Sequence, residues 1–291
     1  MIVSLPQIAK LKERVHSRHT SLFTATLIVT SLLLVAIFFA AKFDLRKGLF
    51  RPRAAVSSSA ASMARMPQLI LWAWERPEDL TFIDTRTTGV AFLAGTVFLS
   101  EDKTITRPRL QPLRVPPNTR LISVTRIETD RRAKPSLSVA QQKETVRVIL
   151  ESINRPGVAA VQIDFDAKDS EREFYRELLF ELRRRLPSSL PLTITTLASR
   201  CASDEWLKNL PIDEAVPMIF RMGADAQQVR GLLASGEDFK SPACRSSVGI
   251  STDEPLPSNS SIFKNRRTYV FNPRSWSPEA FARIAQEVQK R

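Results

Sequence analysis

Histidine is almost missing from this 291-residue chain, and the few it has lie near its start. His16 and His19 are the only two, so none follows residue 60. This absence excludes Ser-His-Asp and Cys-His hydrolysis, His-ligated metals and His general bases from the larger part of the chain. Carboxylates, lysines and tyrosines remain as the side chains for acid–base chemistry.

Glycine and cysteine are also scarce. The eight glycines are scattered and form no glycine-rich phosphate loop. Two cysteines, Cys201 and Cys244, are too few for a zinc site, which needs three or four ligands. An exported location would permit a disulfide. However, Cys201 follows one predicted strand and Cys244 precedes another, so we expect them at opposite ends of a barrel and unbridged. We expect neither a cofactor nor a metal.

Acidic residues are outnumbered, and the formal net charge is +13. Residues 1–60 hold nine Lys or Arg against two acidic residues, so +7 of the excess flanks one apolar segment. The remaining +6 is spread out and is not interleaved with stacking aromatics. This distribution suits an anionic membrane surface better than a face that reads DNA, so nucleic acid is not an expected partner.

The apolar segment covers residues 20–41 and carries no charge over its 22 residues. As a helix it is long enough to span roughly 30 Å of hydrocarbon. A cleaved signal peptide has a shorter apolar run of about 7–15 residues, and Phe38-Phe39-Ala40-Ala41 is a poor cleavage site. We therefore expect an uncleaved anchor in a bacterial inner membrane. Residues 1–19 would form a cytoplasmic tail and the large domain would be periplasmic or extracellular, although basic residues on both sides leave the orientation open.

The remainder divides into a linker, residues 42–68, and a folded domain, residues 69–291. The Ala/Ser-rich stretch 51–68 lacks apolar periodicity and is typical of a tether. From Leu69 onward, strand-like runs recur with helical patterns between several of them. The eight predicted strands are Leu69–Glu75, Gly89–Ser100, Arg120–Glu128, Ala160–Asp166, Leu192–Ser199, Ala215–Met222, Ser247–Glu254 and Thr268–Asn272.

Alternating strands and helices predict an α/β fold, and eight strands in this length favour a TIM-like (β/α)₈ barrel. An open doubly wound sheet is the alternative. The stretch from Glu101 to Asn118 is rich in Arg and Pro, so we expect an irregular loop between strands two and three. Predicted helices cover 138–153, 170–185, 203–210, 225–233 and the segment after Ser277, with Ser138, Ser170 and Ser277 at their starts.

One predicted strand has an unusual polar face. In residues 161–166 the apolar side chains alternate with Gln162, Asp164 and Asp166. Both carboxylates therefore lie on one face, and burying two aspartates in a core is costly. This pattern predicts a strand whose polar face lines a cleft, with a solvated edge strand as the alternative.

Further polar and aromatic residues lie where the other strands end, which is the active-site end of such a barrel. For any one of them a solvated loop would be sufficient explanation, but together they indicate a binding cleft. Carboxylates with tryptophans, and no histidine, are typical of a carbohydrate site. The candidate catalytic residues are Asp164, Asp166, Glu75 and Glu128, and the candidate substrate-binding residues are Trp72, Trp74, Arg126, Arg221, Asp253 and Asn272.

Several longer motifs resemble a bacterial family catalogued as domain of unknown function 3142. They are LWAWERPEDL (71–80), RPRLQPLRVPPNTRLI (107–122), VQIDFDA (161–167), DEAVPMIFRMG (213–223), GISTDEP (249–255) and YVFNPRSW (269–276). The resemblance implies a barrel similar to glycoside hydrolases and no assigned reaction. The chain also resembles, more weakly, the chitinase-like family 18 glycoside hydrolases. Asp164 and Asp166 match two positions of that family's D-x-D-x-E motif, but Lys168 replaces the proton-donating Glu.

Two functions follow from these residues. The first is a membrane-anchored enzyme that acts on an envelope or extracellular polysaccharide. Asp166 would be its nucleophile or stabiliser, Asp164 would tune Asp166 by like-charge repulsion, and Glu75 or Glu128 would be the acid. The second, favoured by Lys168, is a glycan-binding protein without catalysis on the same scaffold. The sequence does not fix the oligomeric state.

Overall fold

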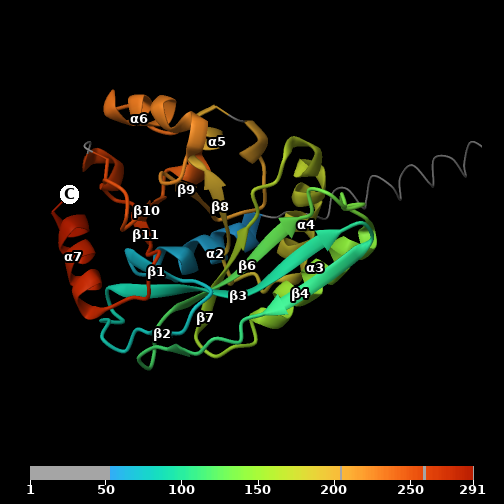
Figure 1. Cartoon of the computed structure of the whole chain (residues 1–291), viewed down its shortest axis with the longest axis horizontal. Coiled ribbons are helices and arrows are strands. Elements are labelled where there is room, and N and C mark those ends of the chain that lie inside the picture. The colour runs from blue at the N-terminus through green and yellow to red at the C-terminus, as the bar shows by residue number, and fades with distance from the viewer. Residues whose placement is uncertain (1–52, 204, 258–259, 291) are drawn as a thin grey trace, which may run out of the picture. The chain divides into compact units, whose positions relative to one another are not determined.

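The structure is a computed structural model that describes residues 53–203, 205–257 and 260–290. Eight parallel strands close into a barrel (Figure 1), because the first strand pairs with both the second and the last. Closure confirms the barrel and excludes the open doubly wound sheet. The strands are β1 (Leu69–Ala73), β3 (Thr88–Ser100), β6 (Leu121–Thr129), β7 (Val158–Asp164), β8 (Leu192–Leu197), β9 (Glu214–Met218), β10 (Ser247–Ser251) and β11 (Arg267–Phe271).

Helices follow five of these strands. They are α3 (Val139–Ser152), α4 (Arg172–Arg185), α5 (Ala198–Ser203), α6 (Ala226–Ala234) and α7 (Pro278–Gln289). Ser138 caps α3 in a capping box and Ser277 caps α7, as predicted. The chain enters α4 through a 3₁₀ turn, Asp169–Glu171, so Ser170 is not its cap. In Figure 1, α3 and α4 lie side by side, and contacts between them agree with this view.

Apolar side chains point to both faces of the barrel strands. The inward set fills the barrel with residues such as Ile70, Trp72, Val124 and Tyr269. The outward set packs against the surrounding helices in a second, larger core. β1 and β10 are buried along their whole length. A strand that is buried on both faces is expected to have a largely apolar sequence, as β1 does.

The connection between β3 and β6 differs from the irregular loop that we expected. β3 turns at residues 101–102 into β4 (Lys103–Pro108), which pairs with it antiparallel. A short strand β5 (Leu113–Arg114) then pairs with β2 (Glu78–Asp79). The hairpin was not visible in the sequence because β4 is largely exposed and polar. Figure 1 shows β3 and β4 running together beside α3.

The compact unit begins earlier than the expected Leu69, at Ala54. Residues 53–64 of the predicted linker form helix α2. Met63 and Met66, near the end of this helix, are buried with the inward-facing residues of the barrel strands. The guanidinium of Arg267 holds the segment, because it donates to the carbonyl oxygens of Met63 (2.7 Å) and Pro67 (3.0 Å). Arg267 lies at the start of β11, so α2 closes the N-terminal end of the barrel.

A buried carboxylate completes this closure. Glu214 accepts hydrogen bonds from Arg267 and from the Tyr269 hydroxyl, the latter at 2.7 Å. Burial raises the pKa of Glu214, and the Arg267 charge and the Tyr269 hydroxyl oppose that rise. Glu214 and Arg267 therefore form a buried ion pair. The other guanidinium N–H groups of Arg267 donate to the backbone of the α2 segment, and a buried ion pair needs such additional hydrogen bonds to offset its desolvation.

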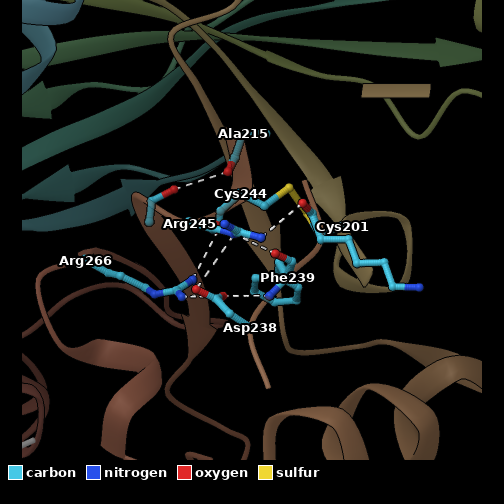
Figure 2. Close-up of a disulfide and its surroundings, with 9 residues drawn as sticks. Cys201, Ala215, Asp238, Phe239, Cys244, Arg245 and Arg266 are labelled. Carbon is cyan, nitrogen blue, oxygen red and sulfur yellow. Dashed lines mark hydrogen bonds and ion pairs between the residues drawn. A yellow bond between two sulfur atoms is a disulfide. The ribbon is translucent and has the colours of Figure 1, made fainter. Parts of the chain in front are cut away.

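Cys201 and Cys244 form a disulfide (Figure 2), with their Cα atoms 6.0 Å apart. The prediction of unpaired cysteines was wrong because it placed Cys201 at the far end of β8. In the structure α5 folds back over β9, where the turn that carries Cys244 also packs. The backbone N–H of Ser241 donates to the Cys201 carbonyl oxygen at 3.2 Å, and Arg266 donates to the Cys244 carbonyl oxygen at 3.2 Å.

The predicted anchor, residues 20–41, lies outside the described residues. Among the residues that the structure describes, no helix is long and apolar enough to cross a membrane.

Candidate functional site

A cavity of about 210 Å³ opens at the carboxyl ends of the barrel strands, and we call it the central cavity. It lies beside a second cavity of about 290 Å³, the side cavity, and Arg126, Asp164 and Asp166 line both. The central cavity is further lined by Trp72, Trp74, Thr195, Leu197, Met218, Phe220, Arg221 and Phe271. The side cavity adds Phe98, Ile127, Glu128, Thr129, Arg131, Phe165 and Lys168.

Asp164 and Asp166 lie at the centre of this arrangement, as the alternation of residues 161–166 predicted. Asp164 is the last residue of β7 and is half-buried, whereas Asp166 is exposed. The Thr195 hydroxyl on the neighbouring strand β8 donates to Asp164 Oδ1 at 2.6 Å. Burial raises the pKa of Asp164; the Thr195 hydrogen bond opposes the rise, and the nearby Asp166 carboxylate adds to it. The site therefore contains one carboxyl group that resists ionisation beside one that is open to solvent.

Arg126 and Glu128 approach the pair from β6. Arg126 is directly beside Asp164 in the register of the two strands. Its Nε lies 2.8 Å from Glu128 Oε1, and its guanidinium stands over the Trp74 ring at 5.9 Å from the centroid. Asp164, Asp166 and Glu128 thus line one cavity with a single arginine between them.

Aromatic rings form the opposite wall of the central cavity. Phe220 and Phe271 stack face to face with their centroids 5.8 Å apart, and Trp74 meets Phe271 edge-on at 6.3 Å. The guanidinium of Arg221 covers the Phe271 ring at 4.9 Å. Phe220 was missed from the sequence. It lies two residues after Met218, the last residue of β9, which is the spacing at which side chains of an extended segment share a face.

Trp72 lies at the bottom of the central cavity, with most of its side chain buried inside the barrel. Its side chain is inside the barrel and the residue is 3% exposed. The indole N–H donates to Gln162 Oε1 at 2.9 Å, and the ring packs on Tyr269 at 5.3 Å. Most of its surface is therefore used by the core, and Trp74 is the more accessible indole.

Lys168 occupies the side cavity and is held in place by Glu171. The ammonium lies 3.1 Å from Glu171 Oε1 and 3.3 Å from the Thr129 hydroxyl. Glu171 also accepts the Lys168 backbone N–H at 2.8 Å. Burial opposes ionisation of Glu171, but these hydrogen bonds outweigh it and lower its pKa. A fixed cation therefore stands two residues after Asp166.

Three of the predicted residues lie away from the aspartate pair. Glu75 is exposed and lines neither cavity, because β1 ends at Ala73 and the chain turns away. Asp253 and Asn272 line a separate cavity of about 710 Å³ beside α7, which we call the outer cavity. Trp72, Trp74, Arg126, Arg221, Asp164, Asp166 and Glu128 are brought together in the central and side cavities.

Arg109 positions the segment that carries Trp74. Its side chain donates to four backbone carbonyl oxygens, those of Ala73, Trp74, Arg76 and Gln111. Burial lowers the pKa of this guanidinium, and the nearby Glu78 carboxylate opposes that effect. The Arg/Pro-rich stretch after β3 thus has a structural purpose that its sequence did not reveal.

No family model and no curated protein matches the chain, so the resemblance to domain of unknown function 3142 has no support there. One similar solved structure is the Bacillus cereus spore cortex-lytic enzyme SleL. It has 14% sequence identity and a TM-score of 0.39, and the match covers 65% of this chain and 53% of that chain. The chain thus matches about half the length of that enzyme.

In the described part of the chain, no three His, Cys, Asp or Glu side chains are arranged to hold a metal ion. The described side chains that line the central and side cavities carry carboxyl groups, guanidinium groups, one ammonium, hydroxyls and aromatic rings.

Proposed function

We propose that this protein is a glycoside-cleaving enzyme that acts on an envelope or extracellular polysaccharide. The observation that carries the proposal is the lining of the side cavity. Asp164, Asp166 and Glu128 line it together at the carboxyl end of a closed barrel. This is the end at which barrel enzymes place their catalytic residues. The aromatic wall beside the carboxylates supplies apolar faces of the kind on which sugar rings stack.

The different environments of the two aspartates support different roles. Asp166 is exposed in the cavity and is the candidate nucleophile or stabiliser of positive charge on the sugar. Asp164 has a raised pKa, so it is the group in the pair that holds a proton most readily. Glu128 is the alternative acid, but it is engaged by Arg126 at 2.8 Å. Glu75 no longer qualifies, because it lines neither the central nor the side cavity.

Product release tests this proposal. The full-length chain, purified in a mild detergent, is incubated with peptidoglycan and other envelope polysaccharides, and mass spectrometry identifies soluble fragments. We expect fragments from the wild type and at least a hundredfold less from Asp166→Asn. The matched control is Asp169→Asn, because Asp169 is an exposed residue that lines neither cavity. Equal release by both variants would remove Asp166 from the reaction.

The second candidate is a glycan-binding protein without catalysis, and the fixed Lys168 favours it. Lys168 stands where a D-x-D-x-E motif has its proton-donating glutamic acid, and its ammonium is paired with Glu171 at 3.1 Å. In that case the wild type would be retained on a polysaccharide column and release no fragment. Retention that survives Asp166→Asn, with no product from any variant, would select this function.

We also propose that the barrel is exported and anchored by residues 20–41. The uncharged 22-residue run supports an anchor. The Cys201–Cys244 disulfide supports an oxidising compartment, where such bonds persist. Protease added to intact cells should digest the barrel only after the outer permeability barrier is opened. A barrel that is protected until the inner membrane is lysed would contradict export.

A further inference from the structure

The outer cavity has no part in the chemistry described so far. At about 710 Å³ it is larger than the central and side cavities. It lies between the segments that follow β10 and β11 and one face of α7, along which it extends from Glu279 to Glu287. Its volume is within the range of sites for drug-sized ligands, roughly 300–1,000 Å³, whereas each of the two inner cavities lies at or below the lower limit. The inner cavities alone are thus small for an oligosaccharide.

One ion pair separates the outer cavity from the central one. Arg221 lines the central cavity, and its Nη2 lies 3.4 Å from Asp253 Oδ2, which lines the outer cavity. Both side chains are about half exposed. The end of β11 crosses the same boundary, because Phe271 faces the central cavity and Asn272 the outer one. The two cavities are therefore neighbours at the same end of the barrel.

Arg221 is held at this boundary by its backbone. Its φ of 50° is left-handed, which is uncommon outside glycine, and its N–H donates to Glu254 Oε1 at 2.8 Å. The guanidinium is thereby kept over the Phe271 ring. A ligand that leaves the central cavity across Phe271 would meet Arg221 first and the outer cavity next.

The lining of the outer cavity suits a hydroxyl-rich, flexible ligand. Among the described residues that line it there is no Phe, Tyr or Trp, and polar and charged side chains predominate. Carboxylates, guanidinium groups and hydroxyls line it together, for example Glu287, Arg283 and Ser275. Mixed donors and acceptors of this kind pair with sugar hydroxyls, and no large field of one sign selects an ion.

We propose that the outer cavity is a distal binding site for the same glycan chain that occupies the central cavity. The substrate is then a polymer of several sugar units that runs from the Lys168 side, across Asp166, past Arg221 and into the outer cavity. The chain is cut or held internally and not at an end. This inference rests on the proposed function of the central cavity and adds the length of the ligand to it.

Binding of glycan strands of different length tests the inference. Strands released from peptidoglycan are separated into short (two to four sugars) and long (eight or more) pools, and their Kd values for the full-length chain are measured by titration calorimetry. Long strands are expected to bind about tenfold tighter than short ones. Arg283→Ala, which removes a charged donor from the outer cavity, should abolish this advantage and leave short strands unaffected.

Two further variants make the result interpretable. Glu287→Trp fills the outer cavity instead of removing a contact and should have the same selective effect. Lys290→Ala changes an exposed residue just beyond the same helix, outside the cavity lining, and should bind like the wild type. Near-ultraviolet circular dichroism confirms that each variant is folded.

The outcomes separate the two proposals. If neither pool binds, the proposed function fails, and the distal site fails with it. If both pools bind the wild type equally, or if Arg283→Ala and Glu287→Trp keep the preference for long strands, only the distal site is overturned. Loss of the length preference in both variants, with short-strand binding intact, is the result that supports it.

Discussion

Asp164 is a residue whose environment should be visible in the stability of the whole protein. Its pKa is raised by burial. A carboxyl group of this kind favours the folded state most below its unfolded pKa, about 3.9, and loses that advantage as pH rises through its folded pKa. Relative to wild type, Asp164→Asn should therefore gain unfolding free energy as pH rises from 4 to 8. The gain in unfolding free energy is about 1.4 kcal/mol for each unit by which the folded-state pKa of Asp164 exceeds its unfolded-state pKa.

Urea unfolding at several pH values measures this difference. Asp130 supplies a control of opposite sign, because hydrogen bonds from the backbone N–H groups of Arg132 and Ala133 lower its pKa. The stability of Asp130→Asn relative to wild type should instead fall as pH rises from about 2 to about 5, through the lowered folded pKa and the ordinary unfolded pKa of Asp130, and should be constant above that. A difference for Asp164→Asn that does not change with pH would contradict the raised pKa.

At the level of single residues, the sequence predicted that Asp164 and Asp166 share a cavity, but it did not predict that Glu75 lies outside that cavity. Strand alternation correctly placed Asp164 and Asp166 on one face, since that rule depends only on backbone geometry. The same rule did not exclude Glu75 from the candidate site, because it cannot tell where β1 ends. That point depends on Arg109, which lies more than 30 residues later and donates to the carbonyl oxygens of Ala73 and Arg76. Trp72 and Trp74 have equivalent positions in the sequence pattern, yet one is core and the other lines the wall.

Arg109 allows a prediction about the loop after β1. Arg109→Gln should lower the unfolding free energy by about 2–4 kcal/mol, because three partly buried carbonyl oxygens, those of Ala73, Trp74 and Arg76, would lose their donor. Glycan affinity should also fall, since Trp74 is in the loop that Arg109 holds. Arg114→Gln is the matched control: Arg114 is largely exposed and only loosely paired with Asp79 at 3.7 Å. Urea unfolding and glycan titration measure the two effects, and an Arg109 variant as stable as the control would refute the role.

At the level of elements, the pattern of apolar residues was enough to predict the barrel strands. The patterns of β4 and α2 were too weak for these two elements to be predicted. The barrel strands carry runs or alternations of buried apolar residues and so stand out in the sequence, even where polar side chains such as Gln162 and Thr193 are also buried. β4 is short of apolar residues because its pairing with β3 comes from the backbone. α2 looked like a tether because it is rich in Ala and Ser. Among the side chains that the structure describes in this segment, Met63 and Met66, near its end, are buried inside the barrel.

The role of α2 can be tested through those methionines. Met66→Ala in the full-length chain should lower the unfolding free energy by about 2–5 kcal/mol, because a buried side chain inside the barrel is truncated. Arg65→Ala, at the exposed neighbouring position, should change it by less than about 0.5 kcal/mol. Denaturant unfolding measures both values. Equal, small effects would show that residues 53–66 are a tether after all.

At the level of the whole molecule, the disulfide joins two segments 43 residues apart in sequence. A chain-entropy estimate for a loop of this size is about 4 kcal/mol of stability. Reduction of the wild type should therefore lower its unfolding free energy by up to about that amount. The double variant Cys201→Ala, Cys244→Ala should resemble the reduced wild type and be insensitive to the reductant. A wild type whose urea midpoint is the same with and without reductant would contradict a stabilising bridge.

The bonds between Arg267 and the α2 segment also constrain the order in which the protein can be completed. The donor and the Met63 acceptor are 204 residues apart, and β1 pairs with β11 across a similar span. During synthesis the N-terminal segment therefore emerges long before its binding site exists. The barrel cannot close, and its first helix cannot dock, until β11 has left the ribosome. A chain released before residue 267 would lose one strand directly, and it would also leave both ends of its sheet and the buried face of α2 open to association with other chains.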